Sequence, residues 1–96
     1  MNTKQLSKVL KALSNQNRLE LYLEICKHQE SSYQASSECF ITDIIKSLPI
    51  GAPTISHHLK ELTNADLIST ERRGKYLVAK INKNTISEVN KILNGK

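Results

Sequence analysis

The side chains best suited to chemistry in this sequence lie on the polar face of one short segment, residues 52–62. Hydroxyl and imidazole groups can form hydrogen bonds with the base edges of DNA, and a lysine further along the segment can contact a phosphate. The base-contact candidates are Thr54, Ser56 and His57, and the phosphate candidate is Lys60. None of them presents the two-pronged donor that arginine offers to guanine, so we expect modest base discrimination supplemented by DNA shape.

A second group of candidates is a cluster of cations further along the chain. Between Ser69 and Lys80 the positive side chains are opposed by Glu71 alone, and most of them gather around Gly74. The candidates for phosphate or minor-groove contact are Arg72, Arg73 and Lys75. The alternative is an edge hairpin whose charges only protect it against aggregation. We favour DNA contact because the polar segment lies next to this cluster in the chain.

A helix must position the polar candidates. With Ile55 turned inward at about 100° per residue, Leu59 and Leu62 fall on the same face and the polar candidates fall on the other. Pro53 is expected to open this helix, because its missing N–H costs nothing at a helix N-terminus. His58 lies beside the apolar stripe, and we interpret it as a partly buried imidazole tied to a neighbouring backbone group, with a DNA contact as the alternative.

The spacing of the remaining apolar side chains predicts four more helices and a hairpin. We expect the helices at about residues 4–13, 17–28, 40–48 and 84–94, and the strands at about 67–72 and 75–81. Residues 29–38 are rich in Ser and Gln and lack periodicity, which predicts an exposed loop. Asn84 or Thr85 is the expected cap of the last helix. In the second strand, alternation predicts one face on the core and the other toward solvent or DNA.

This order of elements, ααααββα, indicates a mainly α fold with a small β-hairpin, the winged helix-turn-helix. The 96 residues make a single domain, 1–96. Such a small chain has a thin core, so the apolar stripes on the first and last helices predict a homodimer. The expected interface residues are Leu6, Val9, Leu10, Leu13, Ile86, Val89, Ile92 and Leu93.

The charge balance favours a polyanionic partner. Fourteen Lys and Arg stand against nine Asp and Glu, a net charge of +5. Such an excess fits nucleic acid or an anionic membrane, and simple solubility is the alternative. The apolar runs are too short for a membrane span or a signal core, so we expect a cytoplasmic protein without membrane contact. Two cysteines are too few for a disulfide framework.

Several segments of the chain, in order, resemble the ArsR-type family of small bacterial winged-helix repressors. They are Leu10–Leu19 (LKALSNQNRL), Thr54–Leu62 (TISHHLKEL), Ala65–Ile68 (ADLI) and Arg72–Tyr76 (RRGKY). The resemblance implies a homodimer built from the first and last helices and a DNA operator with two-fold symmetry. It also implies repression that is relieved by a metal, an oxidant or another signal.

The chain departs from that family where metal-sensing members bind their ion. Some metal-sensing members carry a Cys-Val-Cys-type pair, whereas Glu38–Ile44 holds the single Cys39. Other members bind zinc through His and carboxylate side chains of the last helix, whereas residues 83–96 contain only Glu88 as a candidate ligand. We therefore predict no family-type metal site and no cofactor. Cys26 and Cys39 remain as sensing candidates. They are inert core thiols, a redox pair, or a metal site together with His28.

Other function classes are less well supported. The sequence has no Gly-rich phosphate loop, no Cys-x-x-Cys and no recognisable Ser/His/acid spacing, so we do not expect an enzyme. The rival from another class is a winged helix that binds a partner protein and no specific DNA. The polar face around Ser56 and the basic hairpin argue against that rival.

Overall fold

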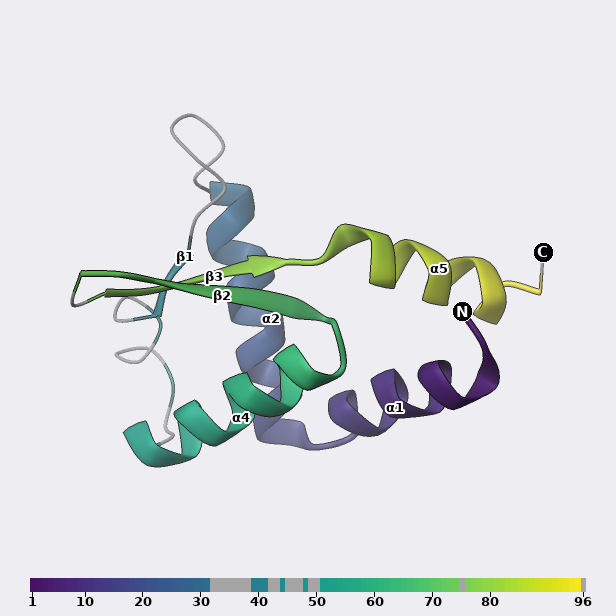
Figure 1. Cartoon of the computed structure of the whole chain (residues 1–96), viewed down its shortest axis with the longest axis horizontal. Helices are drawn as coiled ribbons and strands as arrows, with labels where there is room; N and C mark the ends of the chain where they lie inside the picture. Colours follow the sequence, from purple (N-terminus) through teal and green to yellow (C-terminus); the bar gives the residue numbers. More distant parts are fainter. Residues whose placement is uncertain (32–38, 42–43, 45–47, 49–50, 75, 96) are drawn as a thin grey trace.

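The computed structural model describes residues 1–31, 39–41, 44, 48, 51–74 and 76–95. Its elements in chain order are α1 (Thr3–Leu13), α2 (Gln16–Ser31), β1 (Cys39–Phe40), α4 (Ala52–Asn64), β2 (Ile68–Arg73), β3 (Tyr76–Ile81) and α5 (Lys83–Leu93). The hairpin β2–β3 projects from one end of the molecule, and α1, α5 and both termini lie at the other (Figure 1). The predicted mainly α fold with a small hairpin is confirmed.

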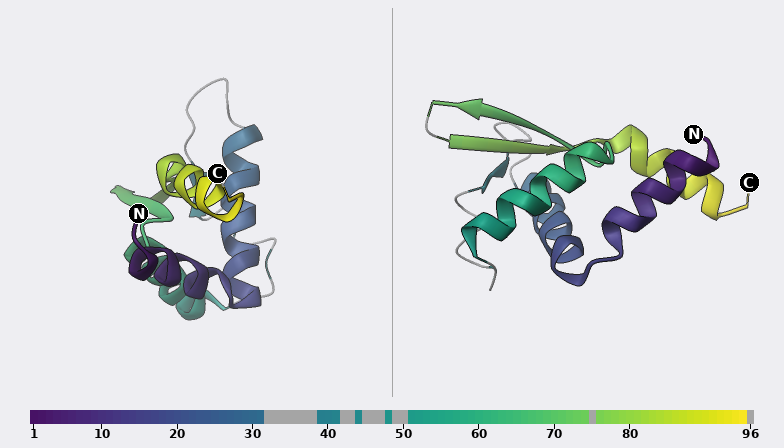
Figure 2. Two further views of the ribbon diagram at one scale, coloured as in Figure 1. Left: turned by 90° about the vertical axis from the view of Figure 1, so that its right-hand side faces the viewer. Right: turned by 60° about the horizontal axis from the view of Figure 1, so that its bottom comes forward.

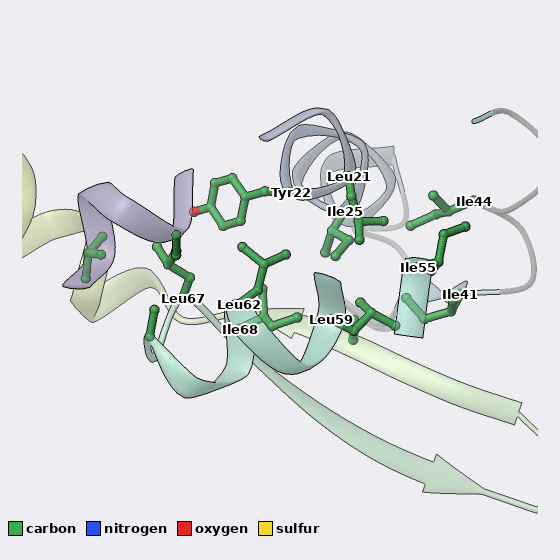
Figure 3. Packing of buried hydrophobic residues seen from close by; sticks show 14 of the residues in the cluster. Leu21, Tyr22, Ile25, Ile41, Ile44, Ile55, Leu59, Leu62, Leu67 and Ile68 are labelled. Carbon is green, nitrogen blue, oxygen red and sulfur yellow. The ribbon is translucent and has the colours of Figure 1, made fainter. Parts of the chain in front are cut away.

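The hydrophobic core lies where α2, α4 and the sheet meet. Leu21 and Ile25 of α2 are fully buried, and they point toward the apolar face of α4 (Figure 3). Ile41 and Ile44 are helical and buried against the same cluster, as expected for the helix predicted at 40–48. The other residues of that predicted helix, apart from Phe40 and Leu48, lie outside the described residues.

The sheet has one strand more than the sequence predicted. Cys39 and Phe40, expected near or within the start of a helix, form β1 and pair antiparallel with Ala79 and Val78 of β3. The strand order is therefore β1-β3-β2, with β3 in the centre. A strand of two residues has no detectable periodicity, and its hydrogen-bond partners lie far along the chain.

The central position of β3 also corrects the predicted alternation. Val78 and Ala79 are neighbours with opposite orientations, yet their exposed fractions are 1% and 0%. Only Tyr76 and Lys80 are exposed on this strand. We expected β3 to be the second strand of an isolated hairpin. In the structure it has a neighbouring strand on both sides, so it is more enclosed than predicted.

Two helix boundaries differ from the predictions. α2 continues to Ser31, so the first residues of the expected loop 29–38 are helical, and residues 32–38 lie outside the described set. Gln and Glu are good helix formers, so a helix outlasts its apolar pattern there. At α5 the cap is Asn82. The Thr85 hydroxyl instead donates to the Asp66 carbonyl at 2.7 Å, which ties α5 to the turn after α4.

Candidate nucleic-acid interface

Helix α4 presents the predicted polar face to solvent. It begins after Gly51, and Pro53 lies in its first turn. Ile55, Leu59 and Leu62 have exposed fractions of 1%, 5% and 0%, which confirms the predicted inward face. The outward side chains, all exposed, are those of Thr54, Ser56, His57 and Lys60. The core therefore holds the helix through one face and leaves four hydrogen-bonding groups available on the other.

The hairpin β2–β3, here called the wing, carries the predicted cations. β2 is exposed from Ser69 to Arg73. Gly74 adopts φ = +60° in the turn, a conformation that favours glycine. Arg73 Nη2 lies 3.3 Å from Glu71 Oε2, and both side chains are largely exposed. An ion pair in water is weak, so this contact is readily exchanged for a phosphate. Arg72 is exposed beside it, and Lys75 lies outside the described residues.

A hollow of about 270 Å³ separates the outer face of α4 from the wing. Its polar lining comes from Ser56, Lys60, Thr63, Asn64 and Thr70, and its apolar lining from Leu59 and Leu77. The Thr63 hydroxyl donates to the Leu59 carbonyl at 2.8 Å, so its proton is already used. Thr70 was not among the predicted site residues, because only the fold brings β2 beside α4.

His58 is buried, as predicted, but its partner is different. Its exposed fraction is 5%, and its Nδ1 accepts a hydrogen bond from Arg18 Nε at 3.4 Å. The expected partner was a backbone group. Burial, the Arg18 charge and the neighbouring His57 lower the pKa of His58 from its ordinary value. The His58 ring is therefore a neutral hydrogen-bond acceptor, and it lies behind the exposed polar face of α4.

The residues predicted for a dimer interface divide into three groups. Val9 and Val89 are buried in the core of the protomer itself, which corrects their assignment to the interface. Leu6, Leu13 and Ile86 are partly buried against that core. Leu10, Ile92 and Leu93 have exposed fractions of 43%, 41% and 60%. Helical spacing groups all of these residues, but only packing shows which of them face inward.

The predicted sensing residues are partly described. Cys26 is half-buried and packs against the core. Burial raises the pKa of the Tyr22 hydroxyl, and interactions with Cys26 add to this effect. Cys39 belongs to β1, but its side chain lies outside the described set, so the redox pair stays one of the alternatives considered for these thiols. His28 Nε2 lies 3.9 Å from Glu24 Oε2.

Two kinds of feature are absent from the described part of the chain. No group of three or more His, Cys, Asp or Glu side chains among those residues is arranged to hold a metal ion. None of the described helices combines the length and the apolar character needed to cross a bilayer.

Comparison with known proteins identifies the family. Residues 34–70, from the segment before β1 into β2, match the family described as "Bacterial regulatory protein, arsR family". The arsenical resistance operon repressor of Bacillus subtilis is 32% identical over 83 residues, covering 86% of this chain and 69% of that protein. The chain belongs to the ArsR family. Its expected role as a DNA-binding regulator, and not an enzyme, is thereby confirmed.

Two further comparisons extend the likeness to nearly the whole chain. The arsenical resistance operon repressor of Staphylococcus xylosus is 29% identical over 93 residues, covering 97% of this chain and 81% of that protein. A crystal structure of an ArsR family transcriptional regulator superposes with a TM-score of 0.79 at 17% identity, covering 99% of this chain and 89% of its own. The described residues of this ArsR-family chain therefore have the fold of an ArsR family regulator.

Proposed function

We propose that this ArsR-family chain is a transcriptional repressor that binds a specific DNA operator through α4 and the wing. The observation that carries the proposal is the two-faced character of α4. Ile55 and Leu62 anchor the helix in the core, while Ser56 and His57 remain exposed, and Ser56 lines the hollow beside the wing. A helix held in this way can enter the major groove while its core packing stays intact.

Each part of this surface has its own role. We assign base contacts to Thr54, Ser56 and His57, because helix-turn-helix proteins read bases mainly with the N-terminal residues of this helix. Lys60, further along α4, is assigned to a phosphate. At the wing, Arg72, Arg73 and Lys75 supply sequence-independent attraction to the backbone or the minor groove. Phosphate contacts orient the protein, and base contacts select the site.

The operator-binding form is proposed to be a two-fold dimer. Exposed Leu10, Ile92 and Leu93 lie on α1 and α5, at the end of the molecule opposite the wing (Figure 2). A second copy that covers these side chains leaves both wings and both α4 helices free. The operator then has two-fold symmetry, with half-sites centred about 34–36 Å apart or a multiple of that distance.

The signal that relieves repression is proposed to act away from the family's metal positions. The segment Glu38–Ile44 offers the single Cys39 in place of a cysteine pair, and a single thiolate is a poor ligand set for a soft metal. Cys26 and Cys39 are then the thiols left for a redox or metal response. A disulfide between them would tether α2 to the segment before the helix-turn-helix.

The test is selection of DNA fragments by the purified protein from a bacterial genomic library, followed by affinity measurements on the recovered duplexes. The proposal predicts a recurrent palindromic sequence that binds more tightly than a shuffled duplex of equal length. Lys91→Ala serves as a control, because it removes a cation from α5 at the far end of the molecule. Equal affinity for the recovered and shuffled duplexes would reject the proposal in favour of a protein-interaction module.

A further inference from the structure

One arginine connects three helices behind the recognition face. Asn15 accepts a hydrogen bond from the Arg18 backbone N–H at 3.0 Å, which fixes Arg18 in the first turn of α2. The Arg18 side chain reaches away from α2 in two directions. Its Nη1 donates to the Ala12 carbonyl in α1 at 3.3 Å, and its Nε donates to His58 Nδ1 in α4 at 3.4 Å. The position of α4 is therefore linked to that of α1.

The His58 ring, which accepts this hydrogen bond, has its other nitrogen buried without a partner among the described residues. Because Nδ1 of His58 accepts, the proton of the neutral ring is on Nε2. That atom is buried and has no hydrogen-bond partner among the residues that the structure describes. An unpaired buried N–H is costly, and an aliphatic side chain at this position would avoid the cost. The hydrogen bond that His58 Nδ1 accepts from Arg18 explains why a polar ring occupies this position.

The charges around the contact are mostly positive. A hollow of about 340 Å³ beside Arg18 is lined by Lys8 and Lys11 of α1 and by Glu61 of α4, with Ala12, Asn64 and Ala65 completing it. The His57 ring centroid lies 6.0 Å from that of His58. Among the residues that line this hollow, Glu61 carries the negative charge. A proton on His58 would therefore face the Arg18 guanidinium from α2 and lie close to the His57 ring of α4.

We propose that Arg18 is a positioning residue for the recognition helix: it holds α4 in place through the neutral His58 ring, and protonation of His58 releases it. This inference rests on the proposed operator binding by α4. A proton taken up from solvent at Nδ1 removes the lone pair that accepts from Arg18 Nε. Two donors and two positive charges then face each other in a buried place, so the contact opens and α4 is no longer linked to α1.

The direction of the pH effect follows from the lowered pKa of His58. As the pH falls below the ordinary value of 6.5, the unfolded chain takes up the proton before the folded chain does. The free energy of unfolding therefore decreases as the pH falls through this window, and above it the full stability is present. Operator affinity decreases in the same direction.

The experiment measures the affinity of the full chain for its selected duplex between about pH 8 and about pH 5 at constant salt. We expect the wild-type affinity to fall about tenfold over this range, which corresponds to about 1.4 kcal/mol. His58→Asn keeps an acceptor near the position of Nδ1 and takes up no proton, so it should bind like the wild type at about pH 8 and show no loss of affinity as the pH falls. His58→Leu fills the space without an acceptor, so it should bind weakly throughout the range. Arg18→Lys retains the charge but not the second donor arm, and should also weaken binding.

The matched control is His28→Asn, which removes the imidazole of α2 that lies near Glu24 and should leave the pH profile unchanged. A His58→Leu variant that binds like the wild type, or a His58→Asn variant that keeps the wild-type pH dependence, would overturn the proposal. Nitrogen NMR of the ring in DNA-free protein supplies an independent readout. It should show that Nδ1 stays without a proton to below about pH 6.5, and amide exchange along α4 should be faster in Arg18→Lys. If the wild type prefers no duplex at any pH, operator binding fails, and these DNA-free measurements still decide the role of Arg18.

Discussion

The two ends of this molecule are both exposed, but they differ in what they expose. At one end, α4 and the wing carry hydroxyls, an imidazole and cations, including Ser56 and Arg72. At the other, α1 and α5 expose leucine and isoleucine side chains, with Leu93 at 60%. Polar groups in water need no cover and can exchange solvent for a nucleic acid. Clustered apolar groups lower their free energy when another apolar surface covers them. The type of exposed side chain, more than exposure itself, therefore indicates the partner of each end.

The largest effect is expected from a break at the apolar end. Leu10→Asp together with Leu93→Asp places charges where the proposed dimer buries leucines. Operator affinity should fall by about a hundredfold or more, because each recognition helix then binds without the other. Sedimentation at micromolar concentration should show a monomer. Leu23→Asp is the control, since Leu23 is exposed on α2 away from this end. A wild type that is already monomeric at this concentration would contradict the prediction.

The next effect belongs to the wing. Arg72→Ala with Arg73→Ala should weaken binding to operator and random duplexes alike, by about tenfold near physiological salt. The slope of log affinity against log salt should decrease by about one unit for each phosphate that the wing no longer neutralises. Anisotropy titrations at several salt concentrations measure both quantities, with Lys91→Ala as the control for charge removal at the other end. An unchanged slope would mean that the wing cations only protect an edge hairpin.

A smaller and more selective effect is expected on the polar face of α4. Ser56→Ala with His57→Ala should reduce the preference for operator over random duplex by about tenfold, because base contacts discriminate and phosphate contacts do not. Affinity for random DNA should stay close to that of the wild type. Competition between the two duplexes measures the ratio directly. If both affinities fell together, these side chains would be backbone contacts and the base-reading residues would lie elsewhere.

The smallest effect concerns the thiols. If Cys26 and Cys39 carry the effector response, peroxide or a divalent metal should change wild-type operator affinity by a few-fold. The double variant Cys26→Ser/Cys39→Ser should bind normally and ignore both reagents. Thiol titration before and after peroxide shows whether the change accompanies oxidation. Wild-type affinity that does not respond to either reagent would identify the cysteines as core residues.

Local patterns predicted which side chains of α4 and the wing are exposed. The inward face of α4 could be identified because Ile55, Leu59 and Leu62 recur at helical spacing, which depends only on residues within the same helix. The hairpin was equally local, since its register pairs Arg73 with Tyr76, three positions along the chain. Contacts between distant segments were not predictable in this way. Arg18 and His58 are 40 residues apart, and no spacing rule connects them.

The same distinction explains the errors. The pairing of β1 with β3 joins residues on either side of α4. At α5, Thr85 was expected to satisfy its own helix, but the fold places the Asp66 carbonyl within its reach. Val9 lies on an amphipathic stripe whose inner edge packs inside the protomer, and the stripe alone does not separate that edge from the outer one. In each case the local preference was reasonable, and a long-range contact decided the outcome.

Strand β1 has a mechanical consequence for the wing. Among the described residues, β1 pairs with Ala79 and Val78, so the hairpin belongs to a three-stranded sheet at these positions and is two-stranded at Leu77 and Tyr76. Two-stranded ribbons twist more readily than wider sheets and have little stability of their own. The wing is therefore held more firmly where β1 pairs with β3 than at Arg73 and Tyr76, near its turn. Arg72 and Arg73 lie on the two-stranded part, so in the proposed complex they would adjust to variations in groove width.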